Sequence, residues 1–218
     1  MAERGERNAL TVGAWWRCRV RGRDGRIVKV VTVGSHAYPD GTVVTLDEPI
    51  AVAQIGDNAA IAAVFGDDGR VSRFEHASHL LPDAPPLWWV EVPETTERPP
   101  AANLMAFTGH GRAEGSLVHH ADFPDLGVPN EAQVGAVRWI PTTGRVDQLY
   151  VQPQWRRRGI SSALIGAAGI LATARDWPRL WGDGQRTALG EAMKQGVGWS
   201  GGMAELTHQH PPMTPGEQ

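Results

Sequence analysis

Short alternating runs of hydrophobic and polar residues fill the first third of the chain and predict a β-rich segment. Alternation with a period of two places the apolar side chains on one face of a strand. Turn-forming residues such as Asp24-Gly25 and Pro39-Asp40-Gly41 separate the runs. Five strands are therefore expected, at residues 14–20, 26–33, 42–46, 60–65 and 71–76. Their length and spacing favour a small barrel or sandwich.

The hydrophobic pattern changes in the second half of the chain. Strands are expected at 87–92, 116–121, 132–140 and 145–151, the last two antiparallel, and one short helix is expected at 101–107. From Ile160 onward apolar residues recur every three or four positions, which predicts a helix that ends before Pro178. A second helix is expected over 185–195, with Gly196 as its C-terminal cap.

Prolines and glycines indicate the domain organisation. The sequence PDAPP at 82–86 is stiff and poor in backbone donors, so it marks a domain boundary. We expect a small β-barrel domain at 1–82, a mixed β-sheet domain flanked by helices at 87–199, and a disordered tail at 200–218. The predicted fold class is α+β.

Composition narrows the class of protein. The chain of 218 residues is 41% hydrophobic and 21% charged, with a formal net charge of -3, so neither nucleic acid nor a membrane is expected as a general partner. The single cysteine, Cys18, offers no disulfide and no metal-binding pair, and no apolar run is long enough to span a membrane. A cytoplasmic protein without a metal is expected.

The stretch VQPQWRRRGISSALI at 151–165 carries the clearest chemistry of the chain. A strand that enters a helix through a glycine-containing turn leaves the first helical N–H groups unpaired. The helix dipole makes this end positive, so arginines placed there are repelled unless an anion is bound. The residues that surround this turn are Arg156, Arg157, Arg158, Gly159, Ser161 and Ser162. Guanidinium groups, hydroxyls and free amides suit a phosphate, so we expect phosphate binding here.

The longer stretch VDQLYVQPQWRRRGISSALI resembles the acetyl-coenzyme A signature of the GNAT N-acetyltransferase superfamily. The family motif is a strand ending in L-x-V-x-P, then a loop with [R/Q]-x-x-G-x-[G/A], then a helix. The matching residues are Leu149, Val151, Pro153, Arg156 and Gly159, with Ser161 in place of the usual Gly or Ala. The order of predicted elements extends the resemblance over residues 116–197.

The resemblance implies how acetyl-coenzyme A would be bound. Backbone amides of the loop would hold the pyrophosphate, and the strand end would bond the pantetheine arm as though it were another strand. The residues implicated in binding are Leu149, Tyr150, Val151, Arg156, Arg157, Arg158, Gly159, Ile160, Ser161, Ser162 and Gln185. Residues 93–115 have room for one helix where the family usually has two, so the chain is expected to be a trimmed GNAT-like member. The N-terminal strands resemble a Tudor-like small barrel.

The family reaction is direct attack of an amine on the acetyl thioester, and the acceptor implied here is an unidentified primary amine. A backbone N–H at a strand bulge, expected near Val151, would polarise the carbonyl. Asp147, expected on the same strand face as Leu149, and Tyr150 are the candidate catalytic residues.

A second family motif falls on QRTALGEAMKQGV, at residues 185–197. Ala188, Lys194 and Gly196 match it. Ala192, however, stands where many family members have the tyrosine that protonates the leaving thiolate. A methyl group cannot protonate a thiolate, so this difference weakens the expectation of catalysis.

Three functional hypotheses are compatible with these residues. The first is an N-acyltransferase acting on a small-molecule or protein amine, its pocket completed by the N-terminal barrel or by another subunit of a homo-oligomer or larger assembly. The second is a non-catalytic binding or structural protein that keeps the fold, which Ala192 and the reduced acceptor region favour. The third is contact with nucleic-acid phosphates through one strand face that carries Arg17, Arg19, Arg21 and Arg23.

Overall fold

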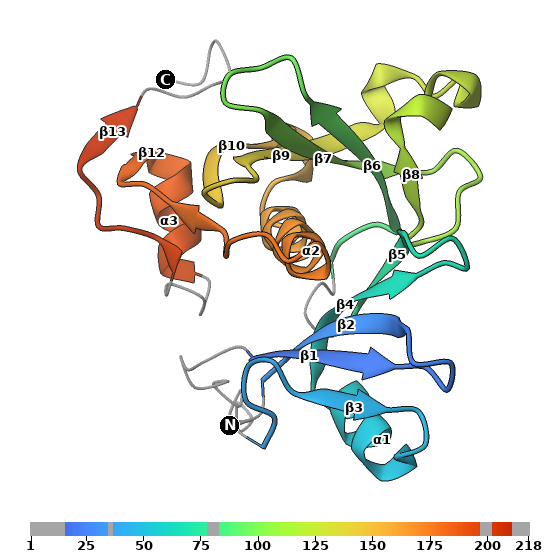
Figure 1. The fold of residues 1–218 in the computed structure, drawn as a ribbon. Helices are drawn as coiled ribbons and strands as arrows, with labels where there is room; N and C mark the ends of the chain where they lie inside the picture. The colour runs from blue at the N-terminus through green and yellow to red at the C-terminus, as the bar shows by residue number, and fades with distance from the viewer. Residues whose placement is uncertain (1–15, 35–36, 78–82, 197–201, 211–218) are drawn as a thin grey trace, which may run out of the picture.

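The computed structural model describes residues 16–34, 37–77, 83–196 and 202–210. Two mixed β-sheets enclose one long helix, α2 (Ile160–Ala174), so the centre of the molecule is a sheet–helix–sheet sandwich (Figure 1). A shorter helix, α1 (Pro49–Asp57), lies on the outer face of the first sheet. The chain is therefore an α+β protein, as predicted.

The first sheet is open and has the strand order β3-β1-β2-β4-β5. Its strands are β1 (Trp16–Arg21), β2 (Ile27–Val33), β3 (Val43–Thr45), β4 (Ala59–Phe65) and β5 (Val71–His76). They confirm the predicted β-rich segment, with small shifts at the strand ends; residues 14–15 of the first predicted strand lie outside the described residues.

The expected barrel is wrong, because β3 and β5 are the two edges of this sheet and do not pair with each other. The edge of β5 instead pairs with the segment that leads into the second sheet. The N–H of Phe74 donates to the carbonyl of Gly115 (2.8 Å), and Arg73 forms a bridge with Ser116, just before the second sheet's strand β8 (Leu117–His119). The edge that would close a barrel thus connects the two sheets.

Helix α1 is not predicted by the alternating pattern. Its Pro49 stands at the first turn, where the fixed φ of proline suits a helix start. The helix packs on the face of the first sheet that points away from α2. The buried residues of this core are Cys18, Val20, Val31, Val33, Val44, Ile55 and Ala62.

The second sheet has the order β11-β10-β9-β7-β6-β8. Its other strands are β6 (Leu87–Glu94), β7 (Ala101–Thr108), β9 (Gln133–Ile140), β10 (Arg145–Val151) and β11 (Trp181–Gly182). The predicted antiparallel pairing of β9 with β10 is confirmed. The short helix expected at 101–107 is wrong: these residues form β7, paired on both sides. Alanine, leucine and methionine favour helices locally, but pairing in the centre of a sheet overrides that preference.

Helix α2 is apolar on all sides because both sheets cover it. Leu164 and Leu171 are fully buried, and the same core contains Val30 and Phe74 of the first sheet and Trp139 of the second. A helix that is hydrophobic all round belongs inside a protein. The segments predicted as two domains, 1–82 and 87–199, therefore share one core, and the boundary between them stays a prediction.

Replacing Gly169 with alanine is expected to stabilise the protein by about 0.5–1 kcal/mol. Gly169 lies in the interior of α2, and a Cβ built on it meets no atom within 4 Å. Alanine loses less backbone entropy than glycine when the helix forms. Urea denaturation should show a higher midpoint at an unchanged slope. A lower midpoint would mean that the neighbours of α2 leave no room for a methyl group.

His76, at the end of β5, is enclosed between the first sheet and α2. Its ring stacks on Trp89 of β6, with 5.7 Å between the ring centroids. Its Nε2 is buried and has no hydrogen-bond partner among the described residues. Burial lowers the pKa of His76 to about 4, although a hydrogen bond with the backbone of Ala163 acts in the opposite direction. The folded protein thus keeps this histidine neutral.

The free energy of unfolding is expected to decrease as the pH falls from 6.5 to about 4. In this window the unfolded chain protonates residue 76 while the folded chain does not, so protons favour unfolding. The stabilisation is present above pH 6.5, and about 3 kcal/mol of it is lost by about pH 4. Urea midpoints measured against pH should vary less in His76→Phe, whereas His120→Gln, at an exposed histidine, should keep the full dependence. Matching profiles for wild type and His76→Phe would contradict the neutral burial.

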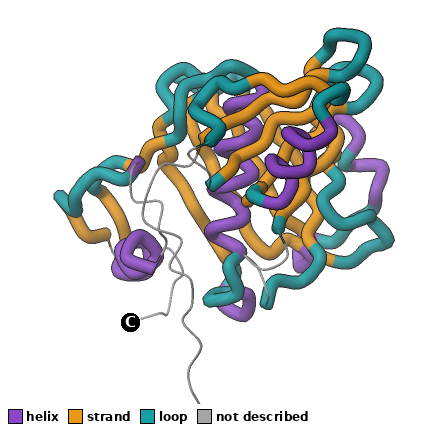
Figure 2. Tube along the Cα trace, turned by 90° about the horizontal axis from the view of Figure 1, so that it is seen from below, coloured by secondary structure: helices purple, strands orange, loops and turns teal. Residues whose placement is uncertain are grey.

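The C-terminal elements lie to one side of the sandwich (Figure 2). β12 (Gln185–Thr187) pairs in parallel with β13 (His208–His210), and α3 (Ala188–Gly196) follows β12 directly. The second helix therefore begins later than expected, because residues 185–187 form a strand. Residues 208–210 form β13 within the tail expected at 200–218, which stays a prediction; residues 200–201 and 211–218 lie outside the described residues. Among the helices described here, none has the length and apolar character needed to cross a membrane.

Candidate functional site

Helix α2 is the next α-helix after β10, and a loop at 152–159 connects the two. The chain leaves β10 through one 3-10 turn, Pro153–Trp155. Gly159 is the N-terminal cap residue, with φ 78° and ψ -1°, a left-handed conformation that favours glycine. The N–H of Ala163 donates the first helical hydrogen bond, to the carbonyl of Gly159 (3.0 Å). The N–H groups of residues 160–162 have no intrahelical partner, and no side chain in the described part of the chain caps them.

Three arginines surround this helix start in different ways. Nε of Arg156 donates to the carbonyl of Val151 (3.1 Å), which ties the loop to the end of β10. The guanidinium of Arg158 lies over the ring of Trp155, 5.1 Å from its centroid. Arg157 and Arg158 are exposed, and neither forms an ion pair within the described ranges. Because a helix N-terminus is already positive, this arrangement attracts an anion.

Trp155 also belongs to this site, although the family motif does not include it. The ring–guanidinium contact fixes Arg158 beside the helix start at little entropic cost. The signal in the sequence is an aromatic residue directly before a run of three arginines.

One edge of β10 is open where it approaches this turn. β11 has two residues and pairs only with Arg145 and Val146, at the beginning of β10. The N–H of Gln152 donates to β9, and alternate residues turn their N–H and C=O groups to opposite edges, so Leu149 and Val151 turn theirs away from β9. No other described strand pairs with this stretch. An extended ligand with amide groups can bond to such an edge as an added strand.

Gly135 of β9 allows β10 and α2 to approach closely behind this edge. A Cβ at Gly135 would lie 2.6 Å from the carbonyl oxygen of Tyr150 and 3.0 Å from Cδ1 of Leu164. Contacts of this length are too short for any side chain. A glycine inside a strand pattern is the sequence signal of such an approach.

Asp147 lies on the face of the second sheet opposite to that of Leu149. The register of β10 against β9 shifts at Asp147, which makes it the extra residue of a β-bulge. Leu149 packs against the core beside α2, whereas Oδ2 of Asp147 accepts a hydrogen bond from Nη1 of Arg138 (2.5 Å). The expectation that both residues share a face is therefore wrong, because the bulge interrupts the alternation. The bulge expected near Val151 lies at Asp147 instead.

Arg138 organises a charged cluster on this outer face of the sheet. It lies between the core residues Val137 and Trp139 of β9, so its side chain points away from α2. Its Nε donates to Glu94 (2.8 Å) in addition to the bond with Asp147. The hydrogen bond with Arg138 lowers the pKa of Glu94, and the same bond raises the pKa of Arg138. Asp147 thus belongs to an ion-paired network.

Of the remaining predicted residues, Tyr150 lies on β10, and Gln185 and Ala192 lie in the C-terminal elements. Tyr150 is half-buried on β10, on the face opposite to that of its core-facing neighbours. Gln185 belongs to β12, where its side-chain oxygen lies 3.1 Å from Nε2 of His210. Ala192 is exposed on α3. The predicted residues from 149 to 162 run from the end of β10 through the loop into the first turn of α2, and Gln185 lies in a separate sheet.

The open edge of β10 leads through the loop at 152–159 to the uncapped start of α2. The first can bond an extended ligand that carries amide groups, and the second can bind a phosphate. In comparisons with known proteins, no protein-family model, no curated protein and no solved structure matches the chain.

Proposed function

We propose that the chain binds acetyl-coenzyme A at this site and transfers the acetyl group to a primary amine. The single observation that carries the proposal is the continuity between the open edge of β10 and the uncapped start of α2. Coenzyme A has the matching order of groups: a pantetheine arm with two amide bonds, joined to a pyrophosphate. The resemblance of residues 147–161 to the GNAT signature supports the same assignment.

In this proposal the backbone performs most of the binding. The N–H and C=O groups of Leu149 and the N–H of Val151 bond the pantetheine amides, and the N–H groups of residues 160–162 hold the pyrophosphate. Arg157 and Arg158 neutralise the phosphate charge from the exposed side of the loop. Arg156 keeps the loop against the strand end through its bond to Val151.

The proposed reaction is one direct displacement. The nitrogen of a neutral amine forms a bond with the acetyl carbon, the carbon–sulfur bond breaks, and the coenzyme leaves as a thiolate. Holding both reactants in contact supplies much of the acceleration. The amine loses one proton and the thiolate gains one; Asp147 and Tyr150 remain the candidate groups for these transfers. To accept the proton, the Asp147 carboxylate must weaken its ion pair with Arg138.

Binding without catalysis is the second candidate function. Ala192 supplies no hydroxyl for the leaving thiolate, and its place on α3 is exposed. Residues 93–115 were expected to have room for one helix where the family usually has two. Residues 101–108 of this region form strand β7 instead. Both observations concern catalysis and acceptor binding, and neither involves the residues proposed to bind the coenzyme.

Titration of the purified chain with acetyl-coenzyme A, followed by calorimetry, tests the proposal. We expect saturable binding that free pantetheine reproduces only weakly, because pantetheine lacks the pyrophosphate. Release of free thiol with a panel of amines then distinguishes the two functions: release supports the transferase, and binding without release supports the binding protein. No heat of binding at millimolar coenzyme would overturn both.

A further inference from the structure

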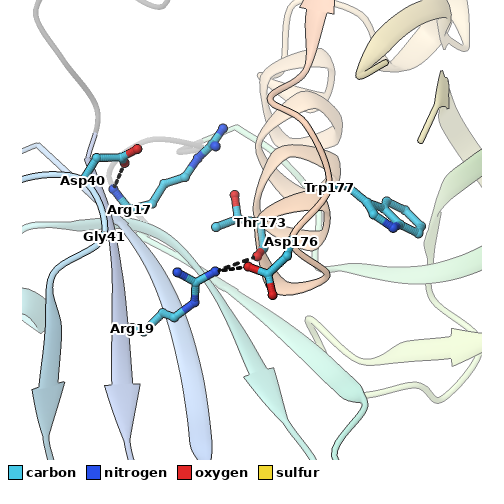
Figure 3. Close-up of a pocket in the computed structure, with 7 residues that line it drawn as sticks. All are labelled: Arg17, Arg19, Asp40, Gly41, Thr173, Asp176 and Trp177. Atoms are coloured by element: carbon cyan, nitrogen blue, oxygen red, sulfur yellow. Dashed lines mark hydrogen bonds and ion pairs between the residues drawn. The ribbon is translucent and has the colours of Figure 1, made fainter. Parts of the chain in front are cut away.

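A pocket lies between the C-terminal end of α2 and β1 (Figure 3). It encloses about 210 Å³ and is lined by Arg17, Arg19, Asp40, Gly41, Thr173, Asp176 and Trp177. The 15 residues of α2 make the helix about 22 Å long, so this pocket is remote from the loop at 152–159. It is distinct from the proposed coenzyme site.

The two carboxylates of this pocket are already engaged. Oδ1 of Asp40 accepts the backbone N–H of Arg17 (2.8 Å), and Oδ2 of Asp40 accepts Nη2 of Arg179 (2.9 Å). Asp176 accepts Nη2 of Arg19 (2.5 Å), and the same guanidinium donates to the carbonyl of Thr173 (3.4 Å). Arg19 thereby compensates the negative end of the helix dipole at the end of α2. Each acid has an arginine partner.

The guanidinium of Arg17 is left over from these pairs. It makes no hydrogen bond and no ion pair with any side chain in the described ranges, and Figure 3 shows it extending toward α2. Burial lowers the pKa of Arg17, the charge of Arg179 lowers it further, and Asp40 opposes both. Three guanidinium groups therefore share two carboxylates, and the excess charge lies on the half-buried Arg17. A planar guanidinium in such a place is suited to an oxyanion.

We propose that this pocket binds a small oxyanion, a phosphate or a carboxylate, through Arg17. The bound anion supplies the missing counter-charge and pairs with the guanidinium in a two-pronged contact. The arginines at 17–23 do not form a continuous surface for nucleic acid, because Arg19 of β1 is paired with Asp176, and Arg23, in the turn after β1, is paired with Asp47. A small ligand at Arg17 fits this arrangement better than a polyanion.

Titration of the full-length chain, labelled with ¹⁵N, with inorganic phosphate and separately with acetate tests the proposal. We expect saturable shifts in the amide signals of Arg17, Gly41 and Asp176. Arg17→Gln should weaken the binding at least about tenfold, the effect of losing a charged hydrogen-bonded pair. Arg21→Gln, an exposed arginine of the same strand, is the matched control and should bind as wild type.

The loop at 152–159 attracts phosphate as well, so the titration is repeated in Arg158→Gln. The shifts around Arg17 should persist in that variant and in the presence of saturating coenzyme A. Saturation by phosphate alone assigns a phosphate site, and saturation by acetate alone assigns a carboxylate site. If neither anion shifts the three amides, or if Arg17→Gln binds as tightly as wild type, the proposal is overturned whether or not the coenzyme binds.

Discussion

Replacing Glu91 with leucine is expected to lower the free energy of unfolding by about 3 kcal/mol. Glu91 lies on β6 with only 3% of its surface exposed, and it pairs with Arg175, which ends α2. Leucine keeps the volume but leaves the partly buried guanidinium without a counter-charge. Breaking a buried pair costs more than the intact pair contributes, because one charge stays desolvated. Urea denaturation followed by tryptophan fluorescence measures the change.

The pair joins the second sheet to the end of α2. The guanidinium of Arg175 lies over the ring of Trp177, 4.9 Å from its centroid, and Nδ1 of His119 is 3.7 Å from the Glu91 carboxylate. These contacts lie at the end of α2 that is remote from the turn at 152–159. The folded Glu91→Leu protein should therefore bind coenzyme A as wild type does, although it unfolds more easily.

A double variant separates the loss of the pair from the loss of packing. In Glu91→Leu with Arg175→Met both charges are gone, and most of the lost stability should return. Arg23→Gln is the exposed control: the Arg23 and Asp47 side chains are 82% and 68% exposed, so its effect should stay within about 0.5 kcal/mol. A Glu91→Leu protein as stable as Arg23→Gln would show that the buried pair does not hold the sandwich together.

The sequence pattern correctly predicted those helices and strands whose conformation is determined by residues close together in the chain. The strands of the first sheet lie between clear turns, and the apolar period of α2 begins at Ile160 as expected. β7 is the counterexample, since Leu104 and its alanine neighbours are compatible with a helix or with a strand buried on both faces. Only its pairing on both sides, with the preceding strand β6 and with β9, which is more distant in sequence, selects the strand. The open sheet has the same origin: Phe74 bonds to Gly115 instead of closing a barrel.

The sequence predicted which charged residues lie at the candidate site, but it did not predict the directions in which their side chains point. Arg157, Arg158 and Gly159 stand at the helix start because adjacent residues in sequence must be adjacent in space. The side of the sheet on which Asp147 lies depends on one extra residue in β10, and a bulge has no strict sequence signature. The contact of Arg158 with Trp155 likewise depends on the turn between them. A motif therefore identifies the anion site more securely than it identifies a catalytic base.

The largest effect on function is expected from replacing Ser161 with aspartate, which should weaken coenzyme A binding at least about a hundredfold. Ser161 lies in the first turn of α2, whose N–H groups have no side-chain cap. A carboxylate there accepts these N–H groups and meets the positive end of the helix dipole. It thus takes the place proposed for the pyrophosphate and repels it. Calorimetric titration with coenzyme A measures the loss.

The same substitution should act in the opposite direction on stability. A carboxylate in the first turn of a helix stabilises it by about 0.3–1 kcal/mol, so Ser161→Asp should unfold at a slightly higher temperature than wild type. Ser161→Asn has the same shape without the charge and should keep most of the coenzyme affinity. Equal affinities of the two variants would contradict an anion site at the start of α2. A lower unfolding temperature of Ser161→Asp would instead contradict the absence of a cap, because the added acid would then have no free N–H group to accept.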